Sequence, residues 1–288
     1  MIQSTLTTSY VFGHPEEESQ RLLRQSRLYN SCTRRFLEQA GITAGMKVLD
    51  VGSGAGDVTF LAGELVGPRG LVVGVEHDLT MLETARARAC AAGLTQVFFV
   101  AGDLRNVALS SDFDAVIGRD ILLYLIDPVA LLRVGVQHLC PGGIVAFQEF
   151  DFSVIERLVA AEGAPAFSQQ LVRWMSAGFR RVGASVQLGT QLSAAFVKAG
   201  LPFPQMRLGS LIGTGPDWAG YDLLAETLCI ILPRLVEYGI VQAGEVDIDM
   251  WSERLRAEVS QQRLFIASGI LVGAWTRVGQ IVDIPLHA

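Results

Sequence analysis

Three glycines, Gly52, Gly54 and Gly56, stand at alternate positions directly after an apolar run in the stretch VLDVGSGAGDVTF. A glycine loop between a strand and a helix lets the backbone approach a ligand and presents N–H groups at the positive end of the helix. The dinucleotide fingerprint GxGxxG has its third glycine where this chain has Asp57, and a carboxylate there would face a pyrophosphate badly. The Walker pattern GxxxxGK[ST] is absent as well. The loop therefore lacks the features that clamp a phosphate, which indicates a ligand other than a dinucleotide or a nucleoside triphosphate.

Acidic residues follow the strands that we expect beside this loop. Asp50 could accept hydrogen bonds from the loop backbone, meet an ammonium group through water, or only tie the turn. Glu76 lies 20 residues after Gly56, where an acid takes both hydroxyls of a ribose. Asp103 could accept from an adenine amine, while the Leu104 N–H could donate to a ring nitrogen. The ligand that fits is adenosine bearing a short cationic group.

Strands and helices alternate around these residues, which predicts a parallel sheet covered on both faces. We expect strands at 46–51, 71–75, 97–102, 113–118 and 144–150, with helices at 15–40, 56–67, 79–93 and 127–140. Beyond Asp151 the pattern predicts helices at 165–182, 189–201, 217–238 and 244–260, and strands at 206–213 and 264–276. We interpret these later segments as additions to one sheet.

Composition excludes several classes of function. The formal charge of −6 and the absence of a Lys/Arg run argue against a nucleic-acid partner. No apolar run reaches the length of a membrane span, and the N-terminus lacks the features of a signal peptide. Four cysteines without a CxxC pattern and four scattered histidines predict free thiols and no metal site. We expect a cytoplasmic protein, and its oligomeric state stays open, although the N-terminal helix could pack over a neighbouring subunit.

The segments VLDVGSGAG, GVEHDLTMLETARARA, VAGDL, FDAVIGRDILLYLIDP and PGGIVAFQEFD occur in this order over about residues 45–151. Together they resemble the class I S-adenosylmethionine (SAM) dependent methyltransferases, in the branch related to ubiquinone and menaquinone biosynthesis. The resemblance implies an α/β fold with a Rossmann-like, doubly wound, seven-stranded and mostly parallel sheet that carries helical lid insertions. It also implies SAM as the cofactor. The sequence departs from the common pattern at two positions. Family members often have Asp where this chain has Glu76, and they usually have an aliphatic residue where it has His77.

The resemblance assigns roles to individual residues. The glycine loop would approach the methionine part of SAM and Glu76 would bind the ribose, while His77 and Met81 would flank the adenine. Arg119 could pair with the SAM carboxylate, or form an ion pair with Asp120 or Asp127. The predicted cofactor-binding residues are Tyr29, Asp50, Gly52, Ser53, Gly54, Gly56, Glu76, His77, Met81, Gly102, Asp103, Leu104 and Arg119.

Methyl transfer from a sulfonium needs alignment, exclusion of water and, for some acceptors, a base. Glu149 and Asp151 are the candidate bases, because they alternate with Phe150 and could face one side of the sheet edge. The alternative is that one caps a helix and the other is exposed.

The insertions at about 152–185 and 214–260 carry many aromatic residues, which favours a small hydrophobic or aromatic acceptor methylated at O, N or C. We expect residues 1–44 to form a helical arm over the cofactor and 45–288 to form the SAM-binding domain. A non-catalytic SAM-binding scaffold is the first alternative. An NAD-type oxidoreductase is the second, disfavoured by Asp57 and Asp103.

Overall fold

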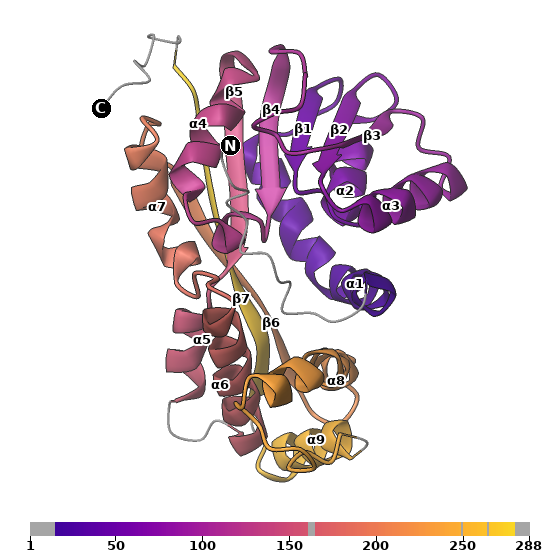
Figure 1. Cartoon of the computed structure of the whole chain (residues 1–288), viewed down its shortest axis with the longest axis vertical. Coiled ribbons are helices and arrows are strands. Elements are labelled where there is room, and N and C mark those ends of the chain that lie inside the picture. The colour runs from indigo at the N-terminus through magenta and orange to yellow at the C-terminus, as the bar shows by residue number, and fades with distance from the viewer. Residues whose placement is uncertain (1–14, 161–164, 249, 264, 280–288) are drawn as a thin grey trace.

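A computed structural model describes residues 15–160, 165–248, 250–263 and 265–279. Its seven-stranded sheet has the order β3-β2-β1-β4-β5-β7-β6; strands β1 to β5 pair in parallel, and β7 runs antiparallel to both β5 and β6 (Figure 1). The strands are β1 (Lys47–Val51), β2 (Leu71–Glu76), β3 (Val97–Ala101), β4 (Phe113–Arg119), β5 (Leu139–Phe150), β6 (Gln205–Thr214) and β7 (Phe265–Arg277). The strand order reverses at β1, where an open α/β sheet forms its ligand crevice. The predicted doubly wound, mostly parallel sheet is confirmed.

Alternating residues of the central strands build two separate hydrophobic cores, one on each face of the sheet. Val48 of β1 packs with α1 (Pro15–Ala40), α2 (Asp57–Val66) and α3 (Leu79–Ala91). Its neighbour Leu49 packs on the other face with α4 (Pro128–Gln137) and α7 (Leu188–Lys198). Successive side chains of a strand point to opposite faces, so a strand buried on both sides must be apolar throughout.

Four further helices gather around the far ends of the two antiparallel strands (Figure 1). They are α5 (Phe152–Val159), α6 (Ala166–Arg181), α8 (Gly220–Glu237) and α9 (Trp251–Gln261). Helices α8 and α9 lie between β6 and β7 in the chain, and most of their buried hydrophobic side chains belong to the same core as those of α4 and α7. The later segments are therefore additions to one sheet, as predicted.

The structure corrects two of the expected elements and adds two that were not expected. The helix expected to reach residue 140 ends at Gln137, because Leu139 already pairs with Phe113 and the Pro-Gly-Gly turn is taken up as an irregularity in β5. Residues 244–248 and 250 are not helical, and α9 begins at Trp251. The sequence analysis also missed α5 and a short 3-10 turn, η1, at Leu122–Tyr124.

The expected N-terminal arm is described only from Pro15, since residues 1–14 lie outside the described residues. All four cysteines are free. Within the described part of the chain, no helix combines the length and the apolar character needed to cross a membrane.

Docking of α1 on the sheet can be tested at Gly273 of β7, where an added Cβ would lie 2.5 Å from the Phe36 ring. Phe36 is fully buried and packs edge-on against Trp275. We expect Gly273→Ala to lower the free energy of unfolding by about 1–3 kcal/mol through overpacking, as measured by denaturant unfolding. Gly279→Ala, where an added Cβ meets nothing within 4 Å, is the control. Equal stability of the two variants would contradict this packing.

Candidate active site

Two cavities meet at the carboxyl ends of the central strands. The large cavity runs from the glycine loop and Glu76, past Arg119 and Asp120, to a chamber lined by α5, α6, α8 and β7. Its empty space, counted together with the solvent at its mouth, is about 1410 Å³, against about 930 Å³ for a second cavity counted in the same way. The small cavity lies beside β2, β3 and α4, and both cavities share Gly52 and Ile121 in their walls. The site therefore divides into a polar end and an apolar end.

The glycine loop is shaped by backbone angles that favour glycine. Gly52, Gly54 and Gly56 have φ values of 68°, 53° and 92°, in the left-handed region. A Cβ at Gly52 would lie 2.7 Å from Ile121, whereas a Cβ at Gly54 would meet nothing within 4 Å. Gly54 thus borders open space in the large cavity, which leaves room for a ligand against the backbone.

Glu76 holds the loop against the end of β2. One carboxylate oxygen accepts the N–H of Gly54 at 2.9 Å, and the other accepts the N–H groups of His77 and Asp78 at 2.8 Å each. Burial raises the pKa of Glu76, but the hydrogen bonds from His77, Asp78 and Gly54 outweigh it and hold the pKa below its usual range. His77 Nδ1 lies 2.9 Å from this carboxylate, which raises the pKa of His77. Glu76 is therefore charged at neutral pH and faces the large cavity.

Two other acids near the loop have partners inside the protein. Asp50 is fully buried and accepts a hydrogen bond from the Thr59 hydroxyl at 2.6 Å, so it ties β1 to α2. Burial raises the pKa of Asp50 to about 7. Asp57 pairs with Arg88 of α3 at 2.7 Å. This ion pair explains how a carboxylate is tolerated at a position that dinucleotide-binding loops give to glycine.

The residues predicted to hold an adenine separate into two groups. His77, Gly102, Asp103 and Leu104 line the small cavity, where Asp103 also forms an ion pair with Arg105. Met81 is buried in α3 and belongs to the lining of neither cavity.

Arg119 and Tyr29 lie at the polar end of the large cavity. The Arg119 guanidinium donates to Thr33 of α1 at 3.1 Å, and the Thr33 hydroxyl donates to Gln148 of β5 at 2.8 Å. Asp120 lies 4.0 Å from Arg119 Nε, whereas Asp127 caps α4 instead of pairing with Arg119. Among the described residues lining the large cavity, Arg119 is the single cation. Tyr29 is 3% exposed and packs edge-on against Phe150.

Six of the predicted cofactor-binding residues line the large cavity: Tyr29, Gly52, Ser53, Gly54, Glu76 and Arg119. Asp50 and Gly56 lie in neither lining and shape the loop from behind. The Ser53 hydroxyl is buried and has no hydrogen-bond partner among the described residues.

The candidate bases Glu149 and Asp151 are both engaged by backbone amides. Glu149 is fully buried and accepts the N–H groups of Ile121, Leu122 and Leu123 at 3.0–3.3 Å. Asp151 caps α5 through the N–H of Val154 and accepts the N–H of Thr190 at 2.6 Å. Asp151 lines the large cavity and Glu149 does not. These contacts favour the capping alternative for Asp151 and a positioning role for Glu149, while a catalytic role for either stays a prediction.

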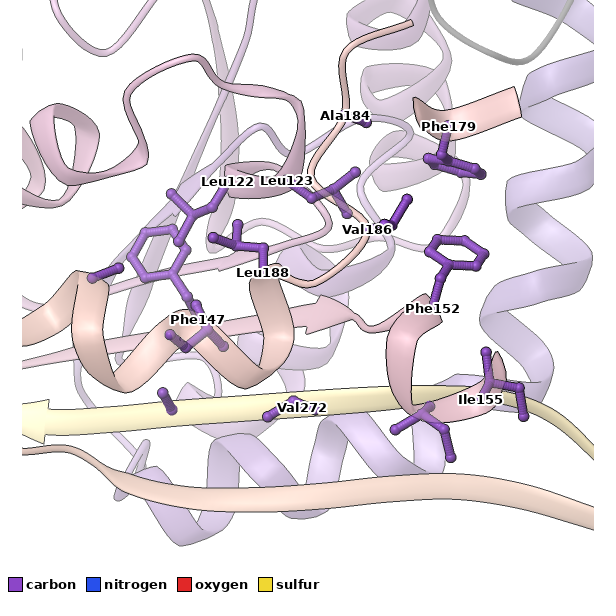
Figure 2. Packing of buried hydrophobic residues seen from close by; sticks show 14 of the residues in the cluster. Leu122, Leu123, Phe147, Phe152, Ile155, Phe179, Ala184, Val186, Leu188 and Val272 are labelled. Atoms are coloured by element: carbon purple, nitrogen blue, oxygen red, sulfur yellow. The ribbon is translucent and has the colours of Figure 1, made fainter. Parts of the chain in front are cut away.

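Apolar side chains form the chamber at the other end of the large cavity. Figure 2 shows Leu123, Phe152, Ile155 and Phe179 of its wall within the hydrophobic core. The sequence analysis missed the wall contributed by the loop after β4, namely Ile121, Leu123 and Tyr124, although the apolar run ILLYL is a signal for it. The three tryptophans of the two insertions, Trp174, Trp218 and Trp251, lie outside the lining; Trp218 packs on Tyr221 and Trp251 on Phe167.

Comparison with known proteins agrees with this geometry. Residues 42–188, just over half of the chain, match a family described as a methyltransferase domain. The chain belongs to this family. SAM is the methyl donor that the match implies, so the predicted cofactor and the class I methyltransferase assignment are confirmed. The branch within the class is not resolved, since the relatives are methyltransferases of various kinds.

Curated relatives align with less than half of this chain. Phosphoethanolamine N-methyltransferase 1 of Arabidopsis thaliana is 32% identical over 41% of this chain and 24% of its own length. The aklanonic acid methyltransferase DauC of a Streptomyces species is 33% identical over 40% of this chain and 52% of its own length. The matched segments thus span about a quarter to a half of these relatives.

Solved structures extend the likeness in fold. The YcgJ protein of Bacillus subtilis covers 88% of this chain with a TM-score of 0.55 at 14% identity, and 99% of that protein is covered. The [4+2]-cyclase SpnF covers 87% of this chain with a TM-score of 0.52 at 18% identity, and 81% of it is covered. At such identities the likeness shows the fold alone.

The raised pKa of Asp50 predicts a pH-dependent stability. Because the folded pKa of about 7 exceeds the ordinary 3.8, the contribution of Asp50 to stability is fully present below about pH 4 and is lost as the pH rises through 7. The substitution Asp50→Asn keeps an acceptor for Thr59 without the charge. We expect the stability of the Asp50→Asn variant relative to wild type to rise between about pH 4 and 7, by up to about 4 kcal/mol.

Urea unfolding across this pH range measures the difference. The exposed control Asp222→Asn should run parallel to wild type. Parallel curves for Asp50→Asn and wild type would contradict a buried acid that titrates near neutrality.

Proposed function

We propose that this protein transfers the methyl group of SAM to a small and largely apolar acceptor. The observation that carries the proposal is the continuity of the large cavity, which joins the glycine loop and Glu76 to an apolar chamber. A donor and an acceptor bound at the two ends would meet inside one continuous cavity. Holding two reactants in this way is the main contribution that a protein makes to an in-line transfer.

The residues at the polar end fit the parts of SAM. The charged Glu76 suits the ribose hydroxyls, and the small cavity with Asp103 and Leu104 suits an adenine edge. Arg119, the single cation of the described lining, suits the methionine carboxylate, and Tyr29 of α1 covers this end. When bound, SAM supplies an activated methyl group to the acceptor. The protein then has to orient the two partners and exclude water.

The chamber supports an apolar acceptor. Its wall includes Phe152, Ile155, Leu171, Met175 and Phe179, and α8 and β7 contribute further aliphatic side chains. Ligand sites of this kind are mainly apolar with a few placed polar groups, which give orientation. Glu149 and Asp151 already accept backbone N–H groups, which makes them poor candidates for a base. This favours an acceptor that reacts without a strong base. The acceptor atom is O, N or C.

A non-catalytic SAM-binding protein is the second candidate. The specific observation in its favour is that one protein of the same fold is described as a [4+2]-cyclase, so the fold alone does not require methyl transfer. The intact loop and Glu76 argue for cofactor binding in both cases. An NAD-type oxidoreductase is disfavoured, because the Asp57–Arg88 pair occupies the place of the third glycine.

Finer assignments belong to the same proposal. We propose a small-molecule enzyme of secondary metabolism, with residues 1–44 as an arm over the cofactor and 45–288 as the SAM-binding domain. The cytoplasm and a relation to the ubiquinone and menaquinone methyltransferases stay predictions. Homo-oligomerisation through the N-terminal helix is part of the same prediction.

Glu76→Gln tests the cofactor site. The substitution keeps the size of the side chain and removes the charge that would receive the ribose hydroxyls. We expect S-adenosylhomocysteine to bind about 10- to 100-fold more weakly in calorimetric titrations, the effect of a lost charge-assisted hydrogen bond. Glu83→Gln, an exposed acid on α3, is the matched control. Unchanged affinity in Glu76→Gln would show that the ribose is held elsewhere.

Met175→Trp tests the acceptor end, because Met175 of α6 lines the chamber and a larger ring would fill it. The assay adds enzyme and methyl-labelled SAM to an extract of the producing cells and identifies the labelled product. We expect Met175→Trp to lose labelling by an order of magnitude or more while it still binds S-adenosylhomocysteine. Met250→Trp, at an exposed position, should label as wild type does.

No labelled product from wild type, together with retained binding of S-adenosylhomocysteine, would favour the non-catalytic candidate. Clear binding of NAD without binding of SAM would favour the oxidoreductase.

A further inference from the structure

Asp120 adopts a left-handed backbone conformation that residues other than glycine rarely take. Its φ is 55°, and among the described residues only Arg263 shares a positive φ without being glycine. Two hydrogen bonds of 2.9 Å clamp it to β5: its N–H donates to the Gln148 carbonyl, and its Oδ1 accepts the N–H of Phe150. Strained backbone of this kind persists where the surroundings hold it and clusters at functional sites.

The position of Asp120 in the large cavity is the second observation. Asp120 lines the large cavity and stands in the chain between Arg119, at the polar end, and Ile121, where the apolar wall begins. Arg119 Nε is 4.0 Å from its Oδ2. The side chain is 19% exposed, in contrast to the fully buried Glu149.

A second carboxyl group, that of Glu149, lies close to Asp120 and makes it less favourable for both acids to be charged. The pKa of Glu149 is raised well above its usual range, first by burial and then by the charge of Asp120. Glu149 also fixes the N–H groups of Ile121, Leu122 and Leu123, the residues that follow Asp120. The chain therefore places the Asp120 carboxyl group in the wall of the large cavity, next to the apolar residue Ile121 and close to a second acid, Glu149.

We infer that Asp120 selects the acceptor: it receives an N–H or O–H group of an otherwise apolar molecule and disfavours a molecule with an anionic group at the same place. This inference rests on the proposed function, because it concerns the acceptor end of the same cavity. A buried or half-buried carboxylate favours donors and cations strongly and repels other carboxylates. Asp120 would thereby set which end of the acceptor lies near the methyl group.

Three naphthalenes with one apolar body and different head groups test the inference, with 2-methylnaphthalene as the reference. The probes are 2-naphthol, 2-naphthylmethylamine and 2-naphthoate, titrated calorimetrically into the complex of the full chain with S-adenosylhomocysteine. For wild type we expect the naphthol, the amine or both to bind about tenfold more tightly than the naphthoate, the size of one charge-assisted hydrogen bond. The stronger of the two donors distinguishes a hydroxyl from an amine as the group received.

Asp120→Asn removes the charge and retains an oxygen for the Phe150 N–H, and asparagine tolerates the left-handed region. We expect this variant to lose the preference for donors over naphthoate, with each affinity expressed relative to 2-methylnaphthalene. Asp112→Asn changes an exposed acid outside both cavities and should keep the wild-type order. A purely structural role of Asp120 would weaken all four ligands together and leave their order unchanged.

Two outcomes would overturn the inference at different levels. If S-adenosylhomocysteine binds but Asp120→Asn keeps the wild-type order, or wild type shows no preference, the selection by Asp120 is wrong and the proposed cofactor site stands. If wild type does not bind S-adenosylhomocysteine, the proposed function fails and the inference fails with it.

Discussion

A single buried carboxylate, that of Glu76, links the glycine loop after β1 to the end of β2 and the start of α3. It comes from the end of β2, accepts the Gly54 N–H of the loop that follows β1, and caps the backbone that leads into α3. An acid with 3% of its surface exposed can stay charged only when several donors replace the lost water. Those donors are the His77 ring and the backbone amides of Gly54, His77 and Asp78, so the loop conformation and the charge of Glu76 depend on each other.

The other acids of the site solve the same desolvation problem in different ways. Asp50 has only the Thr59 hydroxyl, and its pKa rises accordingly, whereas Asp57 is paired with Arg88. Glu149 accepts amides at the start of η1, yet burial and the nearby Asp120 still hold its pKa well above the usual range, and Asp151 caps α5. The result is an acid-rich polar end in which Arg119 is the single described cation of the cavity lining. Such an environment suits a positively charged ligand better than a polyphosphate.

The order of strands and helices could be predicted because the spacing of apolar residues along the sequence differs between strands and helices. The fold followed from that order. The loop glycines and Glu76 could be placed for the same reason, since the ends of parallel strands meet at one edge. The boundary of α4 could not, because Leu139 is recruited to β5 by pairing with Phe113, a contact far apart in sequence. Glu149 looked available as a base because sequence shows alternation and not the three amides that come from the preceding loop.

The two helices α8 and α9 form part of an excursion between β6 and β7, at the edge of the sheet farthest from β3. Helix α8 supplies one wall of the apolar chamber, whereas the glycine loop, Glu76 and Asp103 belong to the other half of the sheet. Sequence drift in the excursion can therefore reshape one end of the cavity without disturbing the hydrogen bonds of the other. The cofactor end of the cavity can thus be conserved in evolution while the acceptor end changes.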